Sequence, residues 1–265
     1  MKSYLRRARN YISELWYRRP WCFRQKELLF TQILTTVGHR DDIYRYMHRY
    51  FYNICPVDVR DHRKYFSRNK RGFGEDALHA MWFSIFKQFR PIRCLEIGVY
   101  RGQVISLWAL LAKKFDFKCD IHGISPFENE GDSVSNYIGG VNYYQDVLQN
   151  HKVFNLATPS LFRGYSADEL AIEYIKSISW DLIYIDGNHN YDVAIADYEL
   201  SIRCLNIGGI LVMDDSSLYA DYNPSRFAFA GHPGPSRVVK ERAMNDLILI
   251  GSVGHNNVFQ KLREI

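Results

Sequence analysis

From residue 91 onward, short apolar runs alternate with longer segments of helical periodicity. The short runs predict strands at Cys94–Gly98, Asp120–Ile124, Leu161–Gly164, Leu182–Ile185 and Ile210–Met213. The longer segments predict helices over Gln103–Lys114, Ala167–Ser177 and Val193–Asn206. A tight turn at Gly208-Gly209 feeds the fifth strand, and a final hairpin is predicted from Leu247–Gly251 and Asn257–Lys261. This alternation is typical of an α/β protein with a doubly wound, seven-stranded, mostly parallel, Rossmann-like sheet.

Residues 1–90 follow a different pattern. Aromatic and apolar positions such as Tyr44, Met47 and Phe51 recur at spacings of three and four, which predicts helices. One of these helices, Asp76–Phe89, follows a basic, glycine-containing loop. We therefore expect a helical N-terminal extension, residues 1–90, before an α/β domain, residues 91–265. The extension either packs a core of its own or closes in part over a substrate pocket.

The charge is divided along the same boundary. The whole chain carries +5, but residues 1–90 hold 19 Lys and Arg against 8 Asp and Glu, whereas residues 91–265 hold 15 against 21. Residues 1–26 interleave arginines with tyrosines and tryptophans. Such a segment suits peripheral contact with an anionic membrane, or it packs its aromatic side chains on the domain or on a second copy in a homo-oligomer. No nucleic-acid-binding signature accompanies it.

Composition excludes several other classes of protein. The five cysteines are scattered and form no C-x-x-C pair, so neither a disulfide framework nor a zinc ribbon is expected. No apolar run approaches the roughly 18 residues of a membrane span. The basic N-terminal residues also precede no continuous apolar segment of the kind found in secretory signals. We expect a cytoplasmic protein that is associated with a membrane, if at all, only peripherally.

Carboxylates follow two of the predicted strands. Asp186 ends one apolar run, and Asp214 and Asp215 end the next. Residues past the carboxyl ends of neighbouring parallel strands share one crevice, where three carboxylates repel one another unless a cation lies among them. Oxygen ligands suit Mg²⁺ or a similar divalent ion. His189 lies three residues after Asp186 and can act as a general base. The structural alternatives are that the acids cap turns and that His189 binds a loop carbonyl.

The first strand ends in the pattern E-x-G-x-x-x-G, formed by Glu96, Gly98 and Gly102. Glycines allow a tight turn and close approach of the backbone to a ligand. A dinucleotide site would instead show G-x-G-x-x-G and a helix N-terminus for the phosphates. An acid at the turn favours a ligand with a cationic end, which argues against an NAD-dependent dehydrogenase.

The segments LEIGVYRG, GISPF, DLIYIDGNHNY and NIGGILVMDDSS, in this order, resemble those of class I S-adenosylmethionine-dependent methyltransferases. Within that class they are similar to metal-dependent O-methyltransferases that modify the sugars of macrolides and related glycosides. The resemblance covers about residues 91–265. It implies S-adenosylmethionine and Mg²⁺, or another divalent cation, as cofactors. It also implies methyl transfer to a hydroxyl of a small-molecule or glycan acceptor.

The resemblance assigns roles residue by residue. The methionine end and sulfonium of the cofactor would be held by Glu96, Gly98, Tyr100 and Gly102. The metal ligands would be Asp186, which also borders the cofactor, with Asp214 and Asp215, and His189 would be the base. The remaining two positions are serines: Ser125 stands where the family binds the ribose with an acid, and Ser166 stands beside the adenine.

Both serines leave an alternative. Ser125 offers less acceptor capacity than a carboxylate, so Glu128 or a water would have to assist. This departure supports the alternative of a cofactor-binding protein without catalytic activity. Ser166 could instead cap the helix that follows. Tyr191 and Asp197 are interpreted as packing and helix-surface residues.

Two long segments, residues 126–150 and 216–236, are rich in glycine, proline and aromatic residues. Both follow predicted strands at their carboxyl ends, so both are expected to form loops over the crevice. Their aromatic residues would suit a sugar or an aromatic acceptor equally well.

Overall fold

The computed structural model describes residues 12, 25–128, 131–132, 134, 137–224 and 228–265. The basic segment 1–26 lies almost entirely outside the described residues, so its membrane and subunit contacts stay predictions. Among the residues that are described, no helix is both long enough and apolar enough to cross a membrane.

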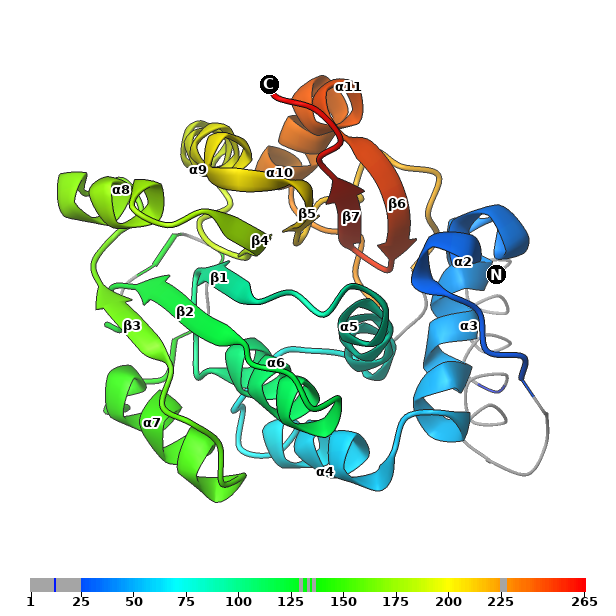
Figure 1. Cartoon of the computed structure of the whole chain (residues 1–265), viewed down its shortest axis with the longest axis horizontal. Coiled ribbons are helices and arrows are strands. Elements are labelled where there is room, and N and C mark those ends of the chain that lie inside the picture. The colour runs from blue at the N-terminus through cyan, green and yellow to red at the C-terminus, as the bar shows by residue number, and fades with distance from the viewer. Residues whose placement is uncertain (1–11, 13–24, 129–130, 133, 135–136, 225–227) are drawn as a thin grey trace, which may run out of the picture.

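Seven strands form one sheet in the order β3-β2-β1-β4-β5-β7-β6 (Figure 1). The strands are β1 Arg93–Ile97, β2 Asp120–Ser125, β3 Ser160–Arg163, β4 Trp180–Ile185, β5 Leu205–Met213, β6 Ile248–Val253 and β7 Asn256–Gln260. The first five are mutually parallel, and β7 lies antiparallel between β5 and β6. The predicted seven-stranded, mostly parallel sheet is confirmed.

Helices cover both faces of this sheet (Figure 1). One face carries α2 Phe30–Val37, α3 Arg40–Asn53, α4 Val57–Phe66, α5 Asp76–Phe89, α6 Gln103–Lys114 and α7 Tyr143–Val153. The other carries α8 Glu169–Lys176, α9 Tyr191–Cys204, α10 Pro233–Val238, a π-helical turn Val239–Ala243 and α11 Met244–Asp246. Successive strand residues point to opposite faces, so Cys94 joins the first core and Leu95 the second. The fold is therefore doubly wound, as predicted.

The N-terminal helices share the first core with the sheet. Met81 and Trp82 of α5 belong to the same buried cluster as Tyr184 of β4, and the Trp82 and Tyr184 rings lie 5.1 Å apart. The interpretation of a helical cap with its own core is therefore wrong for the described residues. The loop before α5, with Gly72, Phe73 and Glu75, instead borders the main cavity of the molecule.

Several predicted boundaries differ from the structure. Strand β5 begins at Leu205 and runs through Gly208-Gly209, because Leu205 already pairs with Trp180 across an irregular register. Helix α9 consequently ends at Cys204. The two long segments are also not loops throughout, since α7 begins at Tyr143 and α10 at Pro233.

Candidate active site

A cavity of about 700 Å³ opens at the carboxyl edge of the parallel strands. The sheet order reverses between β1 and β4, and ligands of open α/β sheets bind at such a switch point. The cavity is lined by nine of the ten predicted site residues: Glu96, Gly98, Tyr100, Ser125, Ser166, Asp186, His189, Asp214 and Asp215. Gly102 lies just behind the lining, at the start of α6.

The glycine turn after β1 is held by contacts within the protein. Gly98 has φ +103°, and a Cβ atom there would lie 1.9 Å from the carbonyl oxygen of Asp186. Gly102 has φ +76° and precedes α6, where a Cβ would lie 3.0 Å from Val147. The tight turn was predicted, but the close approach at Gly98 is to the β4 loop. Tyr100 lies in the same turn, with its ring 5.1 Å from that of Phe73.

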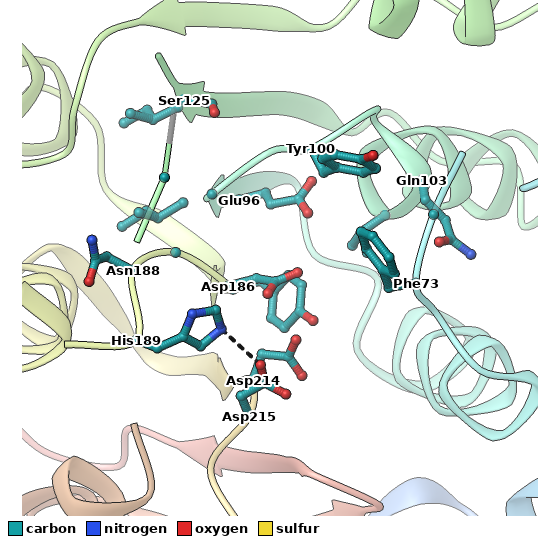
Figure 2. Close-up of a pocket in the computed structure, with 18 of the residues that line it drawn as sticks. Phe73, Glu96, Tyr100, Gln103, Ser125, Asp186, Asn188, His189, Asp214 and Asp215 are labelled. Atoms are coloured by element: carbon teal, nitrogen blue, oxygen red, sulfur yellow. Dashed lines mark hydrogen bonds and ion pairs between the residues drawn. The ribbon is translucent and has the colours of Figure 1, made fainter. Parts of the chain in front are cut away.

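Glu96 presents a carboxylate to the cavity from β1 itself (Figure 2). Its side chain is buried, and one oxygen accepts a hydrogen bond from the backbone of Ile105 in α6. The other oxygen, Oε2, has no hydrogen-bond partner among the described residues. Burial raises the pKa of Glu96 to about 8. A buried acceptor without a partner fits the ammonium group of a methionine-type ligand, which would supply both a hydrogen bond and a compensating charge.

The three aspartates from the ends of β4 and β5 converge at one side of the cavity (Figure 2). The carboxyl groups of Asp186 and Asp214 lie close enough to shift the pKa of each other. Burial and the charge of Asp214 raise the pKa of Asp186. Asp215 adjoins them and has φ +48°. Asp214 and Asp215, with His255, form a group whose ligand atoms are close enough to hold a cation, and Asp186 lies beside this group but does not belong to it.

His189 contacts the carboxylates of Asp132 and Asp215, and Figure 2 shows its position beside Asp215. Its Nδ1 atom lies 2.6 Å from Asp132 Oδ2, which also accepts the His189 backbone N–H at 2.7 Å. Its Nε2 atom lies 2.9 Å from Asp215 Oδ2. Burial alone would lower the pKa of His189, but the two carboxylates raise it. The alternative of a loop carbonyl as its partner is wrong. His189 instead lies next to the acid cluster, which is the group formed by Asp186, Asp214 and Asp215.

Four residues not predicted from the sequence border this cluster. Asp132 anchors His189 from the segment after β2. His232, from the loop before α10, lies with its ring 4.2 Å from that of His189. His255, from the β6–β7 turn, lies with Nε2 3.2 Å from Asp214 Oδ1, and its Nδ1 faces Glu75 before α5. Although burial opposes it, Asp214 and Glu75 raise the pKa of His255 to about 10.

Ser125, the last residue of β2, and Ser166, in the segment after β3, also line the cavity. The capping interpretation of Ser166 is wrong, because Asp168 occupies the N-cap position of α8 and accepts the Tyr165 N–H. Ser166 instead hydrogen-bonds Asp197 of α9. Asp197 is buried, which raises its pKa to about 6, so its interpretation as a helix-surface residue is also wrong.

Two further residues were given roles near the site. Glu128 forms an exposed ion pair with Arg163 and does not line the cavity, so its predicted help to Ser125 lacks support. Tyr191 packs against α10, with its hydroxyl 2.9 Å from Glu241 and the guanidinium of Arg237 4.1 Å above its ring. Its interpretation as a packing residue is confirmed.

Aromatic side chains form the outer wall of the cavity. Phe73 comes from the N-terminal extension, Tyr100 and Tyr137 follow β1 and β2, and Phe229 follows β5. The loop that carries Phe73 is fixed to α6 because the backbone N–H of Gly74 donates to Gln103 Oε1 at 3.1 Å. The prediction that part of the extension closes over the pocket agrees with this arrangement.

Comparison with known proteins agrees with this geometry. Residues 95–216 match the model of a family described as a methyltransferase domain. Over 132 residues the chain is 28% identical to an uncharacterized protein of Acanthamoeba polyphaga mimivirus, a match that covers 48% of this chain. The chain spans about half the length of that curated relative, 52%.

Solved structures share the fold at low sequence identity. An S-adenosylhomocysteine-bound methyltransferase from Podospora anserina superposes with a TM-score of 0.54 and 13% identity, covering 78% of this chain and 88% of that one. An O-methyltransferase from Bacillus cereus in complex with S-adenosylhomocysteine superposes with a TM-score of 0.52 and 13% identity. The match covers 78% of this chain and 92% of that one. The sheet topology, together with the match of residues 95–216 to a methyltransferase-domain family, is that of class I S-adenosylmethionine-dependent methyltransferases. Within that class, the part that matches the family extends from β1 to the turn after β5.

Proposed function

We propose that the protein transfers a methyl group from S-adenosylmethionine to a hydroxyl of a sugar, glycoside or related small molecule. Mg²⁺ or another divalent cation would be a cofactor, and His189 would be the general base. The observation that carries this proposal is the convergence of Asp186, Asp214 and Asp215 beside His189 within one cavity.

The aspartates are well suited to hold the cation. They come from two adjacent strand ends, and the charge of Asp214 contributes to raising the pKa of Asp186, as expected for carboxylates that repel one another without a cation. A divalent cation, when bound, supplies Lewis-acid polarisation of the acceptor hydroxyl. Buried carboxylates that would otherwise repel one another are the ligand set expected for such an ion.

The positions of the remaining site residues support a cofactor that extends across the strand ends. Glu96, with Gly98, Tyr100 and Gly102 in the same turn, would bind the methionine end. Ser125 at the end of β2 would face the ribose, and Ser166 after β3 would face the adenine. Oε2 of Glu96 has no hydrogen-bond partner among the described residues, and it would then accept a hydrogen bond from the ligand.

The base is oriented by the protein. Asp132 binds Nδ1 of His189 and leaves Nε2 directed toward Asp215 and the cavity. The acceptor oxygen would attack the methyl carbon, the carbon–sulfur bond would break, and His189 Nε2 would take the hydroxyl proton. A positioned base contributes roughly 10²–10⁴ to the rate.

The outer wall is compatible with a sugar-bearing acceptor, as it is with an aromatic one. Phe73, Tyr100, Tyr137 and Phe229 offer flat aromatic faces at the cavity rim. Such faces pack well against the apolar C–H face of a sugar ring, while the acids below can bind its hydroxyls. A cavity of about 700 Å³ is within the usual range for sites that bind small molecules.

Radiolabelled methyl transfer to a panel of glycosides and glycans, with and without EDTA, tests this proposal. We expect incorporation that EDTA abolishes and added Mg²⁺ or Mn²⁺ restores. Incorporation at the same rate in EDTA would contradict the metal dependence. Binding of S-adenosylhomocysteine without transfer to any acceptor would favour the alternative of an inactive cofactor-binding protein, which Ser125 supports.

A further inference from the structure

His255 lies against the acid cluster from a part of the chain beyond the matched methyltransferase domain. It occupies the turn between β6 and β7 and is 8% exposed. Its Nε2 atom lies 3.2 Å from Asp214 Oδ1 and 3.9 Å from Asp215 Oδ1. Because β7 runs antiparallel to β5, this turn lies at the same edge of the sheet as the end of β5.

These distances are close to those between ligand atoms that share a cation. With bonds of about 2.1 Å, neighbouring ligand atoms of a tetrahedral or octahedral ion lie about 3.0–3.4 Å apart. The contact with Asp214 falls in this range, and the contact with Asp215 exceeds it by about half an ångström. Asp214, Asp215 and His255 therefore form a compact set of three potential ligands.

A second potential set contains His189 and His232, but it faces the other oxygen of Asp215. Both histidines approach Oδ2, at 2.9 Å and 3.7 Å, whereas His255 faces Oδ1. This set has one carboxylate, whereas the set with His255 has two, of which Asp214 is buried and Asp215 is partly buried. The negative charge that attracts a cation is thus concentrated on the His255 side.

The surroundings of His255 also resemble those of a metal-binding histidine. Such a histidine usually directs its second ring nitrogen to a carboxylate that fixes the orientation of the ring. Here Nδ1 lies 3.7 Å from Glu75 Oε1, which is beyond hydrogen-bond distance, and it has no hydrogen-bond partner among the described residues. Glu75 Oε2 accepts the hydroxyl of Tyr44 at 2.6 Å. On the ligand side, Asn256 Nδ2 donates to Asp214 Oδ1 at 2.5 Å.

We propose that His255 is a nitrogen ligand of the cation, through Nε2, and that it makes the site selective for a transition-metal dication over Mg²⁺. The inference rests on the proposed cation site of Asp186, Asp214 and Asp215 and adds a ligand to it. Imidazole favours first-row transition metals, whereas carboxylates and water alone suit Mg²⁺. The mixed set retains the carboxylates that suit Mn²⁺.

Mn²⁺ alone, added to the metal-free full-length protein without cofactor, is the probe. Electron paramagnetic resonance measures its affinity, and electron spin echo modulation detects a directly bound ¹⁴N nucleus. We expect ¹⁴N coupling in the wild-type protein and its replacement by ¹⁵N coupling after labelling with ¹⁵N-histidine. In His255→Gln the coupling should vanish, and the ratio of Mn²⁺ to Mg²⁺ affinity should fall roughly tenfold or more.

His232→Gln is the matched control, because it removes a histidine that also faces Asp215 but only its other oxygen. The control should retain the nitrogen coupling. Mn²⁺ binding without histidine coupling in the wild-type protein, or with coupling that persists in His255→Gln, would overturn the inference and leave the carboxylate site intact. Absence of Mn²⁺ and Mg²⁺ binding in the wild-type protein would overturn both proposals. The isotope experiment needs no variant, so it remains decisive if His255→Gln fails to fold.

Discussion

His189 and His255 flank the same aspartate and differ in almost everything else. His189 approaches Asp215 Oδ2 from the loop after β4, keeps 19% of its side chain exposed and is oriented by Asp132. His255 approaches Asp214 and Asp215 Oδ1 from the β6–β7 turn, is more deeply buried and faces Glu75. The side chain is the same, but the supporting carboxylate comes from a different part of the chain in each case.

This difference separates two tasks that an imidazole can perform. A histidine at the edge of a cavity can reach a substrate and exchange a proton with it. A buried histidine that lies against two carboxylates is better suited to bind an ion. Position relative to the cavity, rather than residue type, is therefore the basis on which we propose proton transfer for His189 and cation binding for His255.

The largest loss of turnover is expected for a change at Asp214, because this residue lies beside the proposed cation. Asp214→Asn should lower turnover by roughly 10³-fold or more, because the cation loses a ligand and several kcal/mol of charge stabilisation with it. The affinity for S-adenosylhomocysteine, measured by calorimetry, should change by less than about threefold. Asp221→Asn, at an exposed aspartate, is the matched control. Equal losses of turnover and cofactor affinity would place Asp214 in the cofactor pocket or in the fold.

His189→Gln should lower turnover by roughly 10²–10⁴, since it removes the positioned base. Its Mn²⁺ affinity should stay close to that of the wild-type protein, in contrast to His255→Gln. Rapid-mix methyl transfer and Mn²⁺ titration on the same preparation measure the two quantities. A variant with unchanged turnover would remove His189 as the base, and one with lost Mn²⁺ binding would make it a ligand.

His62 is a third kind of histidine, because none of its described hydrogen bonds is to a carboxylate. His62 is fully buried, with its ring nitrogens near His79 and Ser106. Burial lowers the pKa of His62 to about 3. Protonation of His62 therefore favours the unfolded chain. The stability that neutral His62 contributes is fully present above pH 6.5 and is lost as the pH falls toward 3.

Lowering the pH from 7 to 5 should accordingly cost about 2 kcal/mol of stability through His62. Burial lowers the pKa of His79 as well, so its contribution has the same sign. Urea unfolding at the two pH values measures the loss, which should be about 2 kcal/mol smaller in His62→Gln. An identical pH dependence in the two proteins would contradict the assigned pKa.

The smallest effect on turnover is expected for a change at Glu75, the carboxylate that faces His255. Glu75→Gln keeps an acceptor near Nδ1 but removes its charge, so Mn²⁺ affinity should fall by about tenfold. Turnover at saturating Mn²⁺ should recover. Glu241→Gln, at an exposed glutamate on the opposite face, should change neither quantity. Turnover that stays low at any Mn²⁺ concentration would show that Glu75 acts on something other than the cation.

Much of the fold and part of the site could be predicted from the sequence. Apolar runs such as Leu182–Ile185 have the length and flanking turns of buried parallel strands, and the acids after them are close in sequence to the strand ends that position them. Asp186, Asp214 and Asp215 therefore converge as expected. The start of β5 was missed, because Leu205 continues from a helix without a turn residue between them.

The carboxylates that face His189 and His255 from distant parts of the chain could not be predicted in the same way. Asp132 reaches His189 across 57 positions, and Glu75 faces a histidine in the last hairpin. These contacts depend on tertiary packing, which no local pattern records. His255 did leave one signal. The hairpin was predicted, and a hairpin beside β5 must place its turn at the carboxyl edge of the sheet.

The contact between Glu75 and His255 also sets a lower limit on the catalytic unit. Glu75 precedes the matched segment 95–216 and His255 follows it, yet Glu75 faces His255, which lies against Asp214. A fragment trimmed to the recognised domain would lose the antiparallel edge of the sheet and uncover the apolar side of β1 and β4. The smallest piece of this chain able to carry out the reaction must therefore extend well past that segment in both directions.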